Sequence, residues 1–255
     1  MNISPRDYAS VSFWVCASLV ALAAAQAVAA EVSVAVAANF TRPAEEIGAA
    51  FTAKTGNTVV FSFGATGALY AQISQAAPFE VFLSADNKRA AQAVTEGFGV
   101  GGTVFTYAVG KVVLYSPTID VTDGAAVLAA GGFQHIAIAD PATAPYGAAA
   151  LELVGKLGLT EAVTAKQVTG QNIAQTLQFV DSGNAELGFV ALSQVIGKPA
   201  NQVWVVPSEQ YSPILQDAVL LKAGETDPAA VAFIAFLKGP EAADIIRRYG
   251  YELAQ

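Results

Sequence analysis

Cysteine, histidine and charged residues are all scarce in this sequence. With one cysteine, Cys16, and one histidine, His135, the chain has no cysteine pair for an internal disulfide and no Cys/His cluster for a zinc site. Charged residues make up only 13% of the chain, and the formal net charge is −8. Because nucleic acid is bound through Lys and Arg that neutralise phosphates, this acidic balance argues against a nucleic-acid partner.

Long apolar runs are also absent, except at the N-terminus. Residues 11–30 carry no charge, follow Arg6 and end in small side chains. This is the layout of a secretory signal peptide, so we expect residues 1–30 to be removed on export, with cleavage near Ala29 and Ala30. The alternative is an uncleaved membrane anchor, since the run approaches the roughly 20 residues that span a bilayer.

The single cysteine lies inside this predicted signal peptide. The residues before it, Phe13-Trp14-Val15, lack the pattern of a lipoprotein signal, so we expect no lipid anchor. The mature chain then has no thiol and must be held by an ordinary hydrophobic core. Its length of about 225 residues allows one large or two modest α/β domains.

Hydrophobic patterning after residue 30 alternates between strand and helix periods. The expected strands are 32–38, 58–63, 79–84, 103–109, 112–115, 135–139, 185–190, 203–206 and 218–221. The expected helices are 43–54, 67–76, 87–96, 124–130, 146–157, 172–181, 228–237 and 240–249. This alternation predicts an α/β fold with mostly parallel sheets.

Two interruptions of the alternation, at 97–102 and 207–213, indicate two domains. The block between them has its own strands and helices, whereas the C-terminal strand and two helices look like a return to the first domain. We therefore expect a discontinuous domain I of residues 31–108 and 212–255, and a domain II of residues 109–211. A ligand would bind in the cleft between them, outside the carboxyl ends of the strands.

Two strand-to-helix junctions place a small polar side chain where a helix is expected to begin. Asn39 follows the first predicted strand, and Thr66 follows the second. First-turn N–H groups lack intrahelical partners and carry the positive end of the helix dipole, so two such ends facing each other can hold an oxyanion without a charged side chain. Taken singly, each residue is better explained as a helix cap than as a ligand-binding residue. Because both lie at one edge of the same sheet, we favour binding.

A third junction spans residues 136–147 and opens a helix with Pro145 and Tyr146 in its first turn. Asp140 lies in this segment but has no neighbouring carboxylates of the kind that form a calcium loop. We interpret Asp140 as a turn residue.

Six segments, taken in order, resemble the periplasmic molybdate-binding proteins of ABC importers. They are Val36-Ala-Ala-Asn-Phe40, Phe63-Gly-Ala-Thr-Gly-Ala-Leu-Tyr-Ala-Gln-Ile73, Ala77-Pro-Phe-Glu-Val-Phe-Leu-Ser-Ala-Asp86, Ala139-Asp-Pro-Ala-Thr-Ala-Pro-Tyr-Gly147, Glu186-Leu-Gly-Phe-Val190, and Leu237-Lys-Gly-Pro-Glu-Ala-Ala243 with Arg248-Tyr-Gly250. The resemblance runs in register from about Glu31 to Tyr251, essentially the whole predicted mature chain. No single segment is diagnostic, whereas the ordered set is.

The resemblance implies a two-domain type II periplasmic binding protein fold that closes over molybdate or tungstate and delivers it to the membrane permease and ATPase of an ABC importer. It implies a periplasmic monomer with no enzyme activity, no cofactor and no free metal cation, because molybdenum or tungsten is bound as the oxyanion. The family's ligating set falls on Asn39, Thr66, Tyr146 and Ile173. The first two use side-chain and backbone donors in the family, and the other two use backbone N–H groups. Without the resemblance, Ile173 would be interpreted as core.

The chain departs from some family members at two positions. Some have serine where Asn39 stands, and some have an aromatic hydroxyl where Ala191 stands. The second change removes a possible donor from domain II, and we expect Tyr146 to compensate through its hydroxyl or its amide.

A site of donors alone suits molybdate, a doubly charged tetrahedron without protons at neutral pH. Backbone amides, hydroxyls and an Asn NH₂ group offer hydrogens, whereas a carboxylate acceptor would select protonated phosphate. Sulfate has the same charge and shape but shorter bonds, so discrimination against it must depend on the size of the cleft.

An exported enzyme acting on phosphate or sulfate esters would use His135 or clustered carboxylates, but the sequence has no Gly-x-Ser-x-Gly elbow and its carboxylates are scattered. A binding protein for another tetrahedral oxyanion, such as sulfate, is a second alternative. A ligand-sensing domain of a regulator is disfavoured by the signal peptide and by the lack of a DNA-binding segment.

Overall fold

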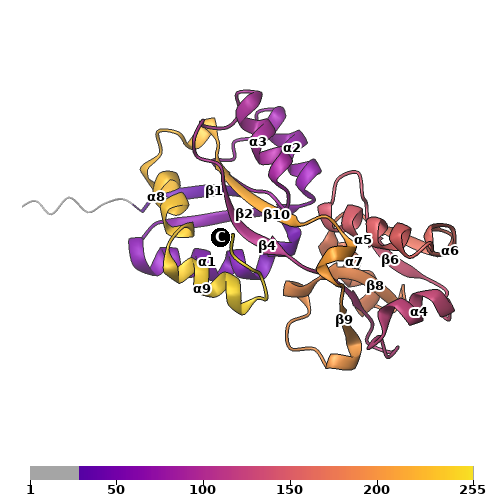
Figure 1. Ribbon diagram of the computed structural model, residues 1–255. Coiled ribbons are helices and arrows are strands. Elements are labelled where there is room, and N and C mark those ends of the chain that lie inside the picture. The colour runs from indigo at the N-terminus through magenta and orange to yellow at the C-terminus, as the bar shows by residue number, and fades with distance from the viewer. Residues whose placement is uncertain (1–28, 255) are drawn as a thin grey trace, which may run out of the picture.

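The computed structural model describes residues 29–254 and contains two α/β domains, each built around a five-stranded sheet (Figure 1). The predicted two-domain α/β architecture is confirmed. The predicted signal peptide, with Cys16, falls outside the described residues except for Ala29 and Ala30, and its cleavage stays a prediction. Among residues 29–254, no helix has the length and apolar character needed to span a bilayer.

The sheet of the first domain has the strand order β2-β1-β3-β10-β4. Its strands are β1 (Glu31–Ala37), β2 (Thr58–Gly64), β3 (Val81–Leu83), β4 (Phe105–Gly110) and β10 (Ile214–Leu220). β1 pairs in parallel with β2 and β3, whereas β10 pairs antiparallel with β3 and β4. Of these strands, only β10 runs against the common direction.

The sheet of the second domain has the order β7-β6-β8-β5-β9. Its strands are β5 (Val112–Tyr115), β6 (Ile136–Ala139), β7 (Gln167–Gly170), β8 (Leu187–Ala191) and β9 (Val203–Val205). β6 pairs in parallel with β7 and β8, whereas β5 pairs antiparallel with β8 and β9. Here β5 is the reversed strand.

Each reversed strand is one that enters its sheet from the other domain. β4 continues through Lys111 into β5, and β10 brings the chain back after β9. Because the other strands point their carboxyl ends toward the neighbouring domain, a strand that arrives from that domain must run the opposite way. Four of the five strands in each sheet share one direction, as the prediction of mostly parallel sheets requires. Because each sheet also contains one reversed strand, both sheets are mixed.

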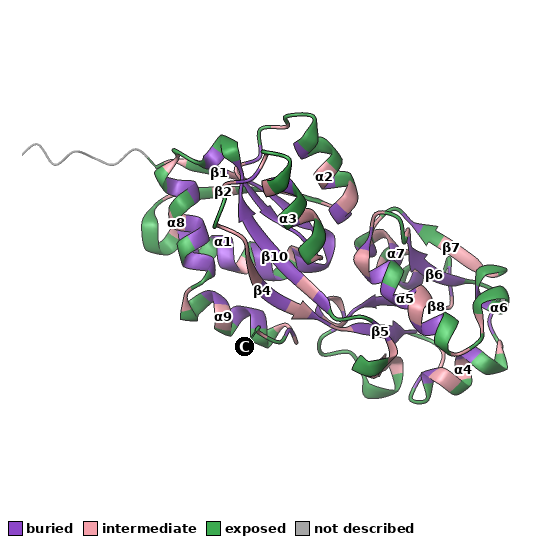
Figure 2. Ribbon diagram, turned by 45° about the horizontal axis from the view of Figure 1, so that its top comes forward, coloured by how far each residue is buried: buried purple, intermediate pink, exposed green. Residues whose placement is uncertain are grey.

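Helices cover both faces of the first sheet. They are α1 (Thr41–Thr55), α2 (Thr66–Ser74), α3 (Asn87–Thr95), α8 (Pro228–Leu237) and α9 (Pro240–Arg248). In β1, Val32, Val34 and Val36 pack with α1, α8 and α9, whereas Ala35 packs with α2 and α3 on the other face. This is the period-two alternation of a strand buried on both sides, and Figure 2 shows the buried strands between helices whose outer faces are exposed.

The second sheet is covered in the same way. Its helices are α4 (Gly124–Ala130), α5 (Pro145–Lys156), α6 (Thr160–Thr164) and α7 (Ile173–Asp181). Leu153 of α5 and Leu128 of α4 pack on one face, and Val180 of α7 packs on the other. Short 3-10 segments are η1 (Ala38–Phe40), η2 (Leu192–Gln194), η3 (Ala200–Gln202), η4 (Ser208–Gln210) and η5 (Lys222–Gly224).

Every predicted strand and helix has a counterpart among these elements, and the sequence patterns missed one strand, β7, one α-helix, α6, and the short 3-10 segments. β7 is a short edge strand whose Gln167 and Thr169 interrupt the apolar pattern, and α6 is little more than one turn. β10 begins at Ile214, four residues earlier than predicted, because Gln216 and Asp217 break the apolar run within it.

Candidate functional site

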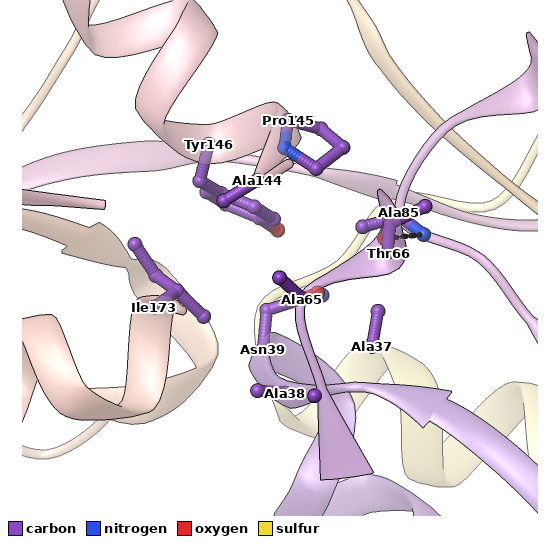
Figure 3. A pocket seen from close by; sticks show the side chains of 11 residues that line it. Ala37, Ala38, Asn39, Ala65, Thr66, Ala85, Ala144, Pro145, Tyr146 and Ile173 are labelled. Carbon is purple, nitrogen blue, oxygen red and sulfur yellow. Dashed lines mark hydrogen bonds between the residues drawn. The ribbon is translucent and has the colours of Figure 1, made fainter. Parts of the chain in front are cut away.

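The four predicted site residues, Asn39, Thr66, Tyr146 and Ile173, line one cavity between the two domains (Figure 3). The cavity is small, with a volume of about 10 Å³ for the centre of a water-sized sphere. Its remaining lining residues are small or apolar: Ala37, Ala38, Gly64, Ala65, Ala85, Ala144 and Pro145. No charged side chain lines it within the described residues. The structure therefore brings the whole predicted set together.

Each of the four residues follows the carboxyl end of a strand. Asn39 lies in η1 after β1, and Thr66 is the first residue of α2 after β2. Tyr146 is the second residue of α5 after β6, and Ile173 is the first residue of α7 after β7. The positive ends of three helices and one 3-10 turn thus point toward the cavity, which favours an anion there.

The Thr66 hydroxyl is arranged to donate. Thr66 is buried, and its Oγ1 accepts a hydrogen bond from the backbone N–H of Ala85 at 3.0 Å (Figure 3). Within the described chain, the hydroxyl proton has no acceptor. A ligand in the cavity can therefore accept that proton, while the Ala85 amide fixes the position of the oxygen.

At the start of α7, every first-turn amide except that of Ile173 has a partner. The Asn172 side chain accepts from the N–H groups of Ala174 and Gln175, both at 3.0 Å, and its carbonyl accepts from Thr176. The N–H of Ile173 has no partner among residues 29–254. The cap thus satisfies its neighbours and leaves one donor for the cavity.

The start of α5 has the same property for Tyr146. Pro145 has no N–H, and the N–H groups of Gly147 and Ala148 both bond to the carbonyl of Ala144. In the part of the chain that the structure describes, the Tyr146 N–H is left without a partner. Two backbone donors, from Tyr146 and Ile173, therefore remain on the side of the second domain.

The side chain of Asn39 bonds to residues that do not line the cavity. Its Nδ2 donates to Gln216 Oε1 at 2.8 Å and to the Tyr251 hydroxyl at 2.9 Å, which uses both of its hydrogens. It makes no cap bond to α1, so the alternative that Asn39 serves as a helix cap is wrong. The expectation that its NH₂ group faces the anion also differs from the structure. What Asn39 offers to the cavity is its backbone N–H in the first turn of η1.

The Tyr146 hydroxyl contacts the first domain. It accepts a hydrogen bond from Gln216 Nε2 at 3.1 Å, and the ring is 2% exposed. Burial, together with the nearby Tyr251 and Tyr107 hydroxyls, raises the pKa of Tyr146 well above its usual value. The hydroxyl therefore stays protonated and links the domains, while the backbone N–H of the same residue has no partner in the described chain.

Ala191 does not line the cavity. It is fully buried at the end of β8, where its N–H donates to Gln194 Oε1 at 2.9 Å. Sequence reasoning missed Gln216, Tyr251 and Ser193, which lie behind the cavity. The signal for Gln216 was its place as a polar residue inside the apolar strand Ile214-Leu-Gln-Asp-Ala-Val-Leu220.

Residues considered for other chemistry lie elsewhere. His135 is exposed, and its backbone N–H donates to Glu186. Asp140 accepts from the N–H of Ala142 at 3.0 Å, so the interpretation of Asp140 as a turn residue is confirmed. Across residues 29–254, no group of His, Cys, Asp and Glu is placed to hold a metal ion.

The two domains also meet at the mouth of the cavity. The N–H of Gly67 donates to the carbonyl of Thr143 at 2.9 Å, and Arg89 Nη2 donates to the carbonyl of Ala142 at 3.0 Å. Arg89 is held in turn by an ion pair with Asp86. These contacts join the two domains beside the cavity residues Thr66 and Ala144.

Residues 32–252 match the sequence model of a family described as bacterial extracellular solute-binding protein. The chain is 56% identical to the molybdate-binding protein ModA of Rhodobacter capsulatus over 225 residues, covering 88% of this chain and 89% of the relative. It is 54% identical to ModA of Azotobacter vinelandii over 236 residues, covering 91% and 94%.

Solved structures give the same result. The periplasmic molybdate-binding protein of Azotobacter vinelandii superposes with a TM-score of 0.84 at 40% identity, covering 88% of this chain and all of that chain. The sulfate-binding protein SubI of Mycobacterium tuberculosis has a TM-score of 0.72 at 13% identity, which shows a shared fold only. The expected two-domain periplasmic binding protein fold is therefore confirmed.

Proposed function

Because this chain belongs to the bacterial extracellular solute-binding protein family, we propose that it binds molybdate and delivers the anion to an ABC importer. The observation that supports this most strongly is the cavity between the domains, which collects donors from both. These are the Thr66 hydroxyl and the backbone N–H groups of Asn39, Tyr146 and Ile173. Like its ModA relatives, the chain is a binding protein and not an enzyme.

The donor set suits an oxyanion that carries no proton. No carboxylate lines the cavity within residues 29–254, so a protonated phosphate would leave its own hydrogen without an acceptor. Fixed N–H dipoles in a buried site stabilise a dianion without a full counter-charge. Selection of molybdate over sulfate then depends on donor spacing, because the smaller ion cannot reach all donors at once.

Binding is coupled to domain closure. Thr66 and Asn39 belong to the first domain, whereas Tyr146 and Ile173 belong to the second, so an anion that bonds to all four bridges the two. A ligand that gains contacts only when the domains are closed shifts the population toward the closed state. The contacts of Gly67 and Arg89 at the mouth supply further closed-state bonds.

Several finer features belong to the same proposal. The domain limits are 31–108 with 212–255, and 109–211. Tungstate, which shares the charge and shape of molybdate, is a second ligand. The mature chain is exported to the periplasm after cleavage near Ala29 and Ala30, acts as a monomer, binds no nucleic acid, and docks on a permease whose ATPase drives import.

Isothermal titration calorimetry of the chain without residues 1–30 tests the proposed function. Molybdate and tungstate should bind with one ion per protein, and sulfate and phosphate should bind far more weakly. Sulfate binding as tight as molybdate binding would overturn the specificity. Absence of binding to all four anions would overturn the function.

A further inference from the structure

A buried polar network lies directly behind the cavity, and Gln216 is at its centre. Gln216 has no exposed surface. Its Oε1 accepts from Asn39 Nδ2 at 2.8 Å and from the Tyr107 hydroxyl at 3.2 Å, and its Nε2 donates to the Tyr146 hydroxyl at 3.1 Å. One carboxamide therefore holds a proposed site residue from each domain.

The backbone around Gln216 is shaped for this position. The register between β10 and β4 shifts between Gln216 and Asp217, and a β-bulge of this kind re-aims a side chain. On β4, Gly110 pairs with Ile214, two residues before Gln216, and leaves the necessary space. A Cβ on Gly110 would lie 2.1 Å from the Tyr146 hydroxyl and 2.7 Å from Gln216 Nε2.

The hydrogen bonds of Gln216 differ in whether they require the two domains to be closed. Asn39 and Tyr107 share the first domain with Gln216, so their bonds to Oε1 need no particular closure. Tyr146 belongs to the second domain and reaches Nε2 only where the domains meet. Tyr251 and Ser193 add a second link, since the Tyr251 hydroxyl donates to Ser193 Oγ at 2.9 Å, and Ser193 Oγ donates to the Asn39 carbonyl at 2.8 Å.

We propose that Gln216 is a positioning residue that couples domain closure to the shape of the anion site. On closure, its Nε2 donates a hydrogen bond to the Tyr146 hydroxyl and so fixes the position of the first turn of α5. Its Oε1 accepts from Asn39 and orients the η1 backbone toward the cavity. Gln216 acts through Asn39 and Tyr146 and does not line the cavity. This inference rests on the proposed binding of molybdate.

The competing explanation is that the network only satisfies buried polar groups, in the open and closed states alike. The two explanations differ in where the Gln216–Tyr146 bond has its effect. A bond made only on closure contributes to anion affinity and not to the stability of the unliganded protein. A bond present in both states contributes to stability and leaves the affinity unchanged.

The variant Tyr146→Phe separates these cases, because it removes only the hydroxyl and keeps both the ring and the backbone N–H. We expect its molybdate affinity to fall about tenfold, with the unfolding midpoint of the unliganded protein unchanged. The matched control is Tyr115→Phe, which removes a buried hydroxyl bonded to Asp181 at 3.1 Å in the second domain. This control should bind molybdate as the wild type does.

A double-mutant cycle with Gln216→Met completes the test. The double variant should bind molybdate no more weakly than Gln216→Met alone, because the second substitution removes a bond that is already lost. Unfolding of the unliganded proteins by urea should show additive effects. Coupling seen in unfolding and absent from affinity would overturn the inference.

Tyr146→Phe decides the matter even where Gln216→Met does not fold. If the wild type binds molybdate and Tyr146→Phe binds it equally tightly, the positioning role is wrong and the proposed function stands. If the wild type binds no oxyanion, the proposed function is wrong and the positioning role falls with it.

Discussion

At the scale of single residues, hydrogen bonds within the protein occupy most polar groups near the site and leave a few donors for a ligand. Thr66 Oγ1 accepts from the Ala85 N–H and keeps its own proton for a ligand. The Asn172 side-chain oxygen accepts from Ala174 and Gln175 and leaves the N–H of Ile173 without a partner in the described chain. The positions of Asn39 and Thr66 could be predicted, because polar residues after two strands are visible in sequence. The engagement of the Asn39 amide could not, since its partners Gln216 and Tyr251 are 177 and 212 residues away in the chain.

Thr66 gives the sharpest single-residue prediction. Thr66→Val keeps the shape and removes the donor, so molybdate affinity should fall by roughly 1–3 kcal/mol, or about 5- to 150-fold in Kd. Thr66→Ser retains the hydroxyl and is the matched control, with an affinity near that of the wild type. Calorimetry measures both. Equal affinities for Thr66→Val and Thr66→Ser would return Thr66 to a purely structural role.

Because of Asp217, next to Gln216, we expect the stability of the folded protein to depend on pH. Burial raises the pKa of this carboxyl above its usual 3.8, against the opposing hydrogen bond from Thr106 and with the added effect of Asp86. A raised folded-state pKa means that ionisation opposes folding. The protonated Asp217 carboxyl therefore contributes to the free energy of unfolding below its unfolded-state pKa, and this contribution is lost as pH rises through its folded-state pKa.

Asp217→Asn removes that ionisation and keeps the acceptor for Thr106. Urea denaturation should show the variant to be more stable than the wild type at pH 7, with the difference shrinking toward about pH 4. Asp244→Asn, at an exposed carboxylate of α9, should change the unfolding free energy by less than about 0.5 kcal/mol at either pH. An Asp217→Asn difference that does not vary with pH would rule out this explanation.

At the scale of elements, the site is an assembly of helix starts. Strand and helix patterns predicted the starts of α2, α5 and α7 within one residue, because apolar periodicity ends where a cap or Pro145 begins, but they did not predict η1. They missed β7, whose carboxyl end leads to Ile173, because this edge strand has too few buried residues to show a pattern. Ile173 was therefore reached through family resemblance alone.

Gly67, at the start of α2, allows this helix to approach Thr143 of the second domain closely. A Cβ there would lie 3.1 Å from Thr143 Cα of the other domain and 2.9 Å from Arg89 Nη2, so Gly67→Ala hinders closure. Molybdate affinity should fall by about 3- to 10-fold, whereas the unliganded protein should gain up to roughly 1 kcal/mol in helix stability.

The control for this prediction is Gly155→Ala within α5. A Cβ there meets nothing nearer than Thr160 Oγ1 at 3.9 Å. Its unfolding midpoint should rise and its affinity should stay at the wild-type value. If Gly67→Ala also keeps the wild-type affinity, the approach of α2 to Thr143 is not part of the bound state.

At the scale of the whole molecule, an acidic protein is proposed to capture a dianion. The net charge of −8 gives no general attraction, so the favourable field must come from the local helix ends. Two domains and their crossing strands could be predicted from the alternation of elements. The β-bulge at Gln216 and the bond across the domains to Tyr146 could not, because they depend on how β4 and β10 pair.

The same arrangement predicts an affinity that is independent of pH. No carboxylate or imidazole within the described chain lines the cavity, and burial raises the pKa of Tyr251 to about 12. The donors and their supporting hydroxyls therefore keep their protons, and the Kd for molybdate should be constant between about pH 7 and 9. A tenfold change in Kd across this range would show that a titrating group takes part in binding.

In the proposed complex, one oxyanion lies between the two domains and accepts hydrogen bonds from donors of both. A crystal structure of the molybdate-bound protein, with the anion located by the anomalous scattering of molybdenum, tests it most directly. We expect a single strong peak in the cavity, with oxyanion oxygens within hydrogen-bond distance of Thr66 Oγ1 and of the backbone nitrogens of Asn39, Tyr146 and Ile173. A peak outside this cavity, or an anion held by one domain alone, would contradict it.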